Sequence, residues 1–125
     1  MIHVDVLSRR PVYEQIIHQT EQLILIGALK PGDQITSVRS LSAQLAINPN
    51  TIQKAYSDLL ARGILVAVPG KGCFVAEDAK QLLGSYKRRQ LEQLEQKVHE
   101  WKLAGIPLQE IEQCIRQAYQ KEGTS

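Results

Sequence analysis

The spacing of apolar residues in the first 77 residues predicts three short helices followed by a β-hairpin. Over residues 11–27 and again over residues 37–63, apolar side chains recur every three or four positions, as in helices that bury one face. Asn48 and Pro49 divide the second stretch into two helices, because Asn favours the N-cap position and Pro the first helical position. Two β-rich runs then flank residues 69–72, a loop of two glycines, one proline and one lysine.

A short lead-in and a tight turn frame the first of these helices. Pro11 is predicted to be its first residue, and Gly27 supplies a left-handed stop. Residues 30–33 place Pro and Gly at the two central positions of a type II turn. Arg9 and Arg10 close the lead-in, either as part of a solvated arm or as a contact to phosphate.

After residue 77 the pattern changes to narrow helical stripes of apolar residues among Gln, Glu, Lys and Arg. One amphipathic helix is predicted up to Gly105, and a second from Leu108 to near Gly123. A helical hairpin of this size cannot bury both stripes by itself, so we expect it to pair with a second copy of the chain. We therefore predict a first domain over residues 1–77 and a dimerisation domain over residues 78–125. The residues predicted to make the dimer contact are Leu83, Tyr86, Leu91, Leu94, Val98, Trp101, Ile111 and Ile115.

Composition and charge narrow the class of protein. The chain has 125 residues, 43% of them apolar, and a net charge of +2, which suits a small globular protein without a strongly basic surface. Its longest apolar runs are too short to span a bilayer, and its first residues do not open a secretory signal. Cys73 and Cys114 lie far apart, with no spacing typical of a zinc site or a disulfide framework. We therefore expect a cytoplasmic protein that needs no metal and no cofactor.

The first turn of the second predicted helix carries a cation. Ser37 is suited to cap this helix, and Arg39 follows within its first turn, on the side away from the apolar residues. A positive charge there opposes the helix dipole, which costs roughly a few tenths of a kcal/mol unless an anion compensates. A DNA phosphate or a guanine edge would be such a partner, and water at an ordinary surface is the alternative.

The third predicted helix has an apolar face and a polar flank near its start. Asn50, Thr51 and Gln53 lie on this flank, and these residue types suit base edges because Asn and Gln pair with adenine and the Thr methyl group contacts thymine. Lys54 suits a phosphate. Each would be ordinary alone on a solvated helix, but together, after a tight turn between two helices, they favour DNA.

The hairpin loop offers a third contact to the same partner. Gly70 and Gly72 let the backbone approach a surface closely, and Lys71 places a cation between them. These residues suit a wing on the sugar-phosphate backbone or in a minor groove, although a plain hairpin that closes the domain has the same pattern. The residues predicted to contact DNA are Ser37, Arg39, Asn48, Asn50, Thr51, Gln53, Lys54, Gly70, Lys71 and Gly72.

Several segments, in order and at matching spacings, resemble the GntR family of bacterial transcription regulators. They are residues 11–16 (PVYEQI), 29–33 (LKPGD), 37–39 (SVR), 48–56 (NPNTIQKAY) and 70–75 (GKGCFV). The short tail resembles the YtrA-type branch of that family. The resemblance implies a mainly α fold with a small β-hairpin, a winged helix-turn-helix followed by a two-helix dimerisation tail. It also implies a homodimeric repressor that binds an inverted-repeat operator in double-stranded DNA.

The same resemblance assigns roles to single positions. Arg39 matches an arginine that contacts bases or phosphate, and Gly70 with Lys71 matches the wing tip. Residues 48, 50 and 51 (Asn, Asn and Thr) match contacts of the recognition helix. Pro49 and Gln53 stand where many members carry arginines, so the resemblance does not extend to one base preference.

Two other classes of function compete with this interpretation. An enzyme is disfavoured because His3, His18 and His99 are scattered, with no carboxylate or cysteine at a catalytic spacing. A winged-helix adaptor that binds another protein through its tail is the main alternative. The sequence identifies neither the operator nor the target genes, and it does not show whether a small-molecule effector binds.

Overall fold

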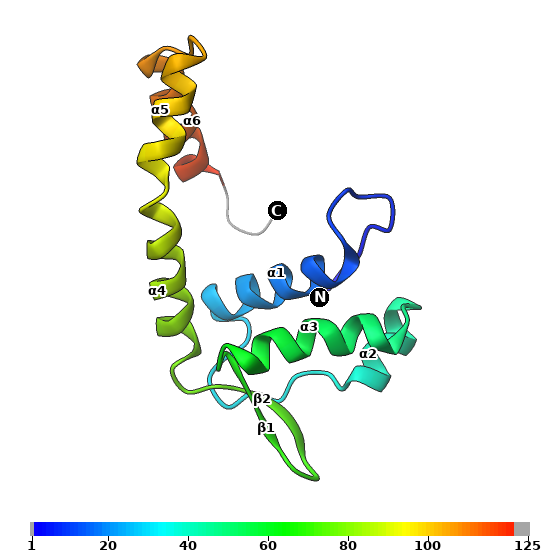
Figure 1. Cartoon of the computed structure of the whole chain (residues 1–125). Helices are drawn as coiled ribbons and strands as arrows, with labels where there is room; N and C mark the ends of the chain where they lie inside the picture. The colour runs from blue at the N-terminus through cyan, green and yellow to red at the C-terminus, as the bar shows by residue number, and fades with distance from the viewer. Residues whose placement is uncertain (1, 122–125) are drawn as a thin grey trace. The chain divides into compact units, whose positions relative to one another are not determined.

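The computed structural model describes residues 2–121, which form two compact units that divide between Gly84 and Ser85 (Figure 1). The sequence placed this boundary after residue 77. The difference arises because Ala79 and Leu83 are fully buried in the core of the first unit. The beginning of the predicted tail is therefore part of the first unit's packing.

The first unit contains three helices and an antiparallel hairpin, in the order α1 (Val12–Leu25), α2 (Val38–Leu45), α3 (Pro49–Ala61), β1 (Leu65–Val68) and β2 (Gly72–Val75). Figure 1 shows α1 and α3 side by side, with the hairpin starting near the end of α3 and projecting away below it. The buried core is built from the apolar positions of the helical pattern and from the start of the hairpin. Its fully buried large side chains are Ile16, Ile52, Leu59, Leu65, Val75 and Leu83. This arrangement confirms the mainly α fold with a small hairpin.

Helix ends follow the local sequence closely. Ser37 caps α2 and its Oγ accepts a hydrogen bond from the Ser40 amide at 3.1 Å, as its residue type predicts. Gly27 ends α1 with φ 82°. Pro11 occupies the N-cap position of α1. The helix therefore begins at Val12, one residue later than predicted. At the end of α2, Ala46 adopts φ 55°, a left-handed backbone conformation that residues other than glycine rarely adopt.

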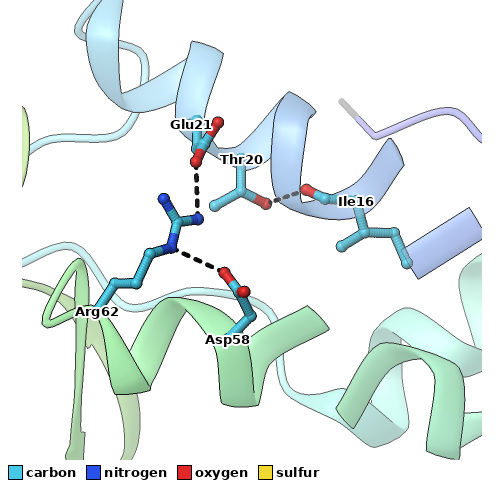
Figure 2. A network of polar contacts seen from close by, with 5 residues as sticks. All are labelled: Ile16, Thr20, Glu21, Asp58 and Arg62. Atoms are coloured by element: carbon cyan, nitrogen blue, oxygen red, sulfur yellow. Dashed lines mark hydrogen bonds and ion pairs between the residues drawn. The ribbon is translucent and has the colours of Figure 1, made fainter. Parts of the chain in front are cut away.

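Two polar contacts fasten α1 to α3 along their length. Near the helix starts, Lys54 Nζ lies 3.9 Å from the centroid of the Tyr13 ring. Near the end of α3, Arg62 donates hydrogen bonds to Glu21 of α1 at 2.7 Å and to Asp58 at 2.9 Å (Figure 2). Partial burial lowers the pKa of Arg62, but the hydrogen bond and charge of Glu21, followed by those of Asp58, raise it above its usual value. The guanidinium therefore stays charged and holds the two helices together.

The lead-in of the chain is bound to α1 by side-chain amides. Gln15, which is buried, accepts a hydrogen bond from the Asp5 amide and donates to the carbonyls of Asp5 and Arg10, all at 2.9 Å. One turn further, Gln19 exchanges hydrogen bonds with the amide and carbonyl of His3. These hydrogen bonds satisfy backbone amide and carbonyl groups of the lead-in that a neighbouring strand would otherwise pair. Arg9 and Arg10 stay exposed in the loop that follows.

The second unit is helical. It comprises the end of α4 (Ala79–Leu91), then α5 (Leu94–Leu103) and α6 (Leu108–Gln120). The single helix predicted up to Gly105 is thus two helices, because a turn at residues 92–93 separates α4 from α5. Gly105, with φ 89°, makes the predicted break before α6. The predicted end near Gly123 lies outside the described residues. No helix within residues 2–121 is long and apolar enough to cross a membrane.

Candidate nucleic-acid interface

The start of α2 presents Arg39 to solvent. The Ser37 cap fixes the first turn, and no acidic residue lies within that turn to neutralise Arg39. Behind it, the Tyr56 hydroxyl donates a 2.7 Å hydrogen bond to the carbonyl of Thr36, the residue before the cap. Burial, with a smaller contribution from Cys73, raises the pKa of Tyr56 to about 12, so this donor stays protonated at neutral pH. Tyr56 is thus a core aromatic residue whose hydroxyl reaches the backbone just before α2.

The start of α3 has one side packed and the other side bare. Ile52, Ala55, Tyr56 and Leu59 are buried, whereas Asn50, Gln53 and Lys54 are exposed and Thr51 is partly exposed. Asn48 caps the helix and its side-chain oxygen accepts the Asn50 amide at 2.8 Å, so this oxygen is already engaged. The Asn50 side chain lies next to this cap, at the end of α3 that meets α2 across the turn. The polar flank therefore has the exposure that base contacts require.

Two residues of this flank have partners within the protein. Gln53 Nε2 donates to Ser57 Oγ at 3.2 Å, one turn along α3. The ammonium group of Lys54 lies over the Tyr13 ring, as described above. These partners orient the two side chains, and Gln53 keeps its Oε1 and its second N–H for a base edge. Sequence periodicity carried no signal for these two contacts, because each partner is an ordinary polar or aromatic residue.

The wing tip is a tight turn over residues 68–71. The Lys71 amide donates to the Val68 carbonyl at 2.9 Å, and Gly70 has φ 76°, as the third position of a type II turn requires. Lys71 is exposed at this tip. Gly72 is not in the loop as predicted but is the first residue of β2, paired with Val68. The loop is therefore one residue shorter than the sequence indicated.

An extended segment just before α2 also pairs with β2. Gln34 pairs with Phe74, the Ile35 amide donates to the Cys73 carbonyl at 3.0 Å, and the Val75 amide donates to the Asp33 carbonyl at 2.8 Å. The type II turn predicted before it is confirmed, with a 2.9 Å hydrogen bond from the Asp33 amide to Lys30 and φ 84° at Gly32. This segment connects the sheet to the start of α2.

The residues predicted to contact DNA thus lie in three places of the first unit. The start of α2 and the start of α3 carry most of them, joined through the turn in which the Ile47 amide donates to the Ser42 carbonyl at 3.2 Å. The wing tip stands apart at the far end of the hairpin in Figure 1. Within the described part of the chain, no three His, Cys, Asp or Glu side chains are grouped to hold a metal ion.

The second unit carries an apolar surface. Leu91, Leu94, Trp101 and Ile115 are between 37% and 63% exposed, and α5 and α6 line an open hollow of about 330 Å³. Ile111 is buried in this hollow, beside Ile106 and Cys114, which the predicted contact set did not include. Of the other residues predicted for a dimer contact, Tyr86 is exposed and Val98 partly exposed.

Leu83 was predicted to contact the second chain, but its side chain is not available for such a contact. Its side chain is fully buried within the first unit, so it has no surface left for a second chain. The helical stripe of α4 is continuous in sequence and gave no sign that its first turns pack on the core. The signal that sequence reasoning missed was Ala79, whose small size lets α4 approach the core closely.

Three comparisons with known proteins identify relatives of this chain. The family described as "Bacterial regulatory proteins, gntR family" matches residues 12–75. The HTH-type transcriptional repressor YtrA of Bacillus subtilis is 40% identical over 118 residues, which cover 94% of this chain and 91% of YtrA. A GntR family transcriptional regulator from Listeria monocytogenes has a similar structure, with a TM-score of 0.72 and 32% identity over 91% of this chain and 98% of that chain.

A second similar structure was solved with DNA. The DNA-binding domain of AraR in complex with operator ORX1 has a TM-score of 0.53 and 33% identity, over 59% of this chain and 92% of that chain. The relatives that these comparisons name are transcription regulators, which are not enzymes. Because the likeness to YtrA continues from the winged helix through the tail, the chain belongs to the GntR family of bacterial regulatory proteins, and in length and extent it is similar to YtrA.

Proposed function

We propose that this protein is a transcription repressor that binds an inverted-repeat operator as a homodimer. The observation that carries the proposal is the asymmetry of α3. One side of this helix is fully buried, while Asn50, Gln53 and Lys54 leave its other side bare at the end that follows the tight turn. A DNA major groove admits such a helix and offers bases to its first residues.

The remaining contacts follow from the geometry of the first unit. Arg39, without an acidic neighbour in its turn, is placed to contact a phosphate or a guanine edge. Lys71 at the wing tip contacts the sugar-phosphate backbone beside the groove. AraR, whose DNA-binding domain was solved with its operator, and YtrA, named as a repressor, support this assignment.

Dimer formation is supported by the apolar surface of the second unit. Its exposed large side chains, among them Leu94, Trp101 and Ile115, surround the hollow that holds Ile111. Covering this surface with a second copy removes it from water and brings two winged helices onto one duplex. Two recognition helices roughly 34 Å apart would then read the two halves of an inverted repeat.

A footprint on the DNA upstream of the protein's own gene tests the proposal. We expect protection of two symmetric half-sites about one helical turn apart. Arg39→Ala and Gln53→Ala should each weaken operator binding by about 1 to 3 kcal/mol and weaken binding to random DNA less. Lys71→Ala should weaken both and lower the salt slope of binding by about one.

Lys30→Ala is the matched control, because it removes one exposed cation from the turn before α2 and lies outside the proposed contact set. It should bind like the unaltered protein. Equal losses on operator and random DNA would argue against base reading by α3. If no footprint and no mobility shift occur at low salt, the proposal is wrong and a protein partner is favoured.

A further inference from the structure

We propose that Gln34 is a positioning residue of the wing, whose side-chain amide holds the wing tip in the orientation that contacts DNA. Gln34 Nε2 donates a 2.7 Å hydrogen bond to the carbonyl of Lys71. The two residues are 37 positions apart in the chain, so the bond joins the segment before α2 to the turn at the wing tip. The inference rests on the proposed function, because it assigns how the wing is held for binding.

The register of the sheet explains why a side chain takes this role. Antiparallel pairing matches residue 34 with 74, so residue 35 faces 73 and residue 37 would face 71. The bond from the Ile35 amide to the Cys73 carbonyl is the last rung of backbone pairing on this side. The chain then turns away, because Ser37 caps α2. In this register, the next backbone hydrogen bond would run from the amide of residue 37 to the Lys71 carbonyl. The side-chain amide of Gln34 donates to that carbonyl in its place.

Gly72 leaves the space through which this amide reaches the wing tip. A Cβ atom at position 72 would lie 2.7 Å from Gln34 Nε2, too close for both to keep their places. The φ of 121° at this position also disfavours any residue with a Cβ. Glycine at position 72 and glutamine at position 34 therefore form a matched pair.

The bond has a consequence for the two outer DNA contacts. Gln34 lies three residues before the Ser37 cap and five before Arg39, in a segment that the sheet and Tyr56 hold in place. By holding the Lys71 carbonyl, it ties the wing tip to the segment that positions Arg39. The spacing between a cation on α2 and a cation on the wing is then fixed within one domain before DNA arrives, which lowers the entropy lost on binding.

Gln34→Leu tests the inference in the full-length protein, in two measurements. In hydrogen exchange without DNA, we expect faster exchange of the Lys71 and Gly72 amides and unchanged exchange of the Val75 amide, whose bond to Asp33 does not involve the side chain. In operator binding, we expect Kd to rise about fivefold, the size that the loss of one such hydrogen bond gives. Gln22→Leu, at an exposed glutamine of α1, is the control and should change neither result.

A double-variant cycle separates positioning from general destabilisation. In a Lys71→Ala background, Gln34→Leu should weaken operator binding by less than twofold, because the wing contact that it positions has already been removed. A fivefold loss that persists in this background would overturn the inference, and so would unchanged exchange at Lys71. If the unaltered protein binds no operator while Gln34→Leu still loosens the wing tip, the proposed function fails and the positioning of the turn stands.

Gly72→Ala tests the spatial match on its own. Because the added methyl group collides with Gln34, the variant should lower the thermal midpoint more in the unaltered protein than in the Gln34→Ala background. The backbone strain at position 72 is the same in both backgrounds and cancels in the comparison. Equal losses would show that Gln34 does not occupy this space, and would overturn the pairing.

Discussion

The two units of this protein differ in how much of their apolar surface they bury themselves. In the first unit, side chains from three helices, the hairpin and the start of α4 form one buried core. In the second, Ile111 is the one buried residue among those described. Leu91, Trp101 and Ile115 are between 37% and 63% exposed. The first unit is stabilised by its own packing, whereas the second presents a surface suited to a partner.

This difference fits the two roles that we propose, DNA binding by the first unit and dimer formation by the second. A DNA-reading surface needs rigid support, because α2, α3 and the wing must keep their spacing, and a closed core provides it. A dimer contact needs apolar side chains that stay accessible until the second chain arrives.

Truncation of a core side chain should affect the first unit strongly. Leu59→Ala removes a fully buried side chain of α3 and should lower the free energy of unfolding by about 2 to 5 kcal/mol. Circular dichroism during urea unfolding measures the loss. Trp101 is the single tryptophan of the chain and lies in α5, so its fluorescence reports the second unit separately.

The matched control for this prediction is Leu103→Ala, at a position that is 75% exposed. It should change the unfolding free energy by no more than about 0.5 kcal/mol. If Leu59→Ala shifts the fluorescence and dichroism midpoints equally, the two units unfold together and the contrast in their stability is lost.

A charge on the apolar surface should weaken the dimer. Ile115 is 46% exposed and borders the hollow between α5 and α6, so Ile115→Glu places a carboxylate where the partner would cover it. We expect the dissociation constant of the dimer to rise about 30-fold, or about 2 kcal/mol, as measured by sedimentation equilibrium. Leu103→Glu, away from the hollow, should leave the dimer intact. An unaltered protein that stays monomeric at micromolar concentration would contradict the dimer.

Alkaline pH should destabilise the first unit through Tyr56. Its pKa is about 12 in the folded protein against 10.0 for an unperturbed tyrosine, so above pH 10 the unfolded chain loses this proton first. The stability that Tyr56 contributes is therefore fully present below pH 10 and declines as pH rises towards 12, by up to about 2 kcal/mol.

Tyr56→Phe isolates this contribution. It should cost about 1 kcal/mol at pH 7 through loss of the hydrogen bond to Thr36, and it should show a shallower decline between pH 10 and 12 than the unaltered protein. Tyr119→Phe, at a 90% exposed position of α6, should keep the decline of the unaltered protein. Identical pH profiles for Tyr56→Phe and the unaltered protein would rule out this origin.

Most of the first unit could be predicted from sequence because its signals are local. Several of its features depend on only one or two residue types each. They are the helix caps at Ser37 and Asn48, the type II turn over residues 30–33 and the left-handed stop at Gly27. The tail was harder to predict. A stripe of leucines indicates a helix but not which surface it packs on, so the burial of Leu83 in the first unit was missed.

The contacts within the candidate interface were also beyond sequence reasoning. Gln15 and Gln34 both act through side-chain amides that bind backbone groups of distant segments, and glutamine carries no pattern that distinguishes this role from simple exposure. The cation–π contact of Lys54 depends on how α1 and α3 align, which periodicity does not determine. Residue types near the start of α3 were predictable, whereas their partners depended on tertiary packing.

The alignment of α1 with α3 has a mechanical consequence. Tyr13 with Lys54 and Glu21 with Arg62 both join residues 41 positions apart, so the helices run in the same direction and are joined at two points about two turns apart along each. Figure 2 shows the second of these points, between Glu21 and Arg62. A shift of α3 along α1 would therefore have to break the Glu21–Arg62 ion pair or lift Lys54 from the Tyr13 ring. In the function that we propose, a displacement of α1 would reach the DNA through these two contacts with α3.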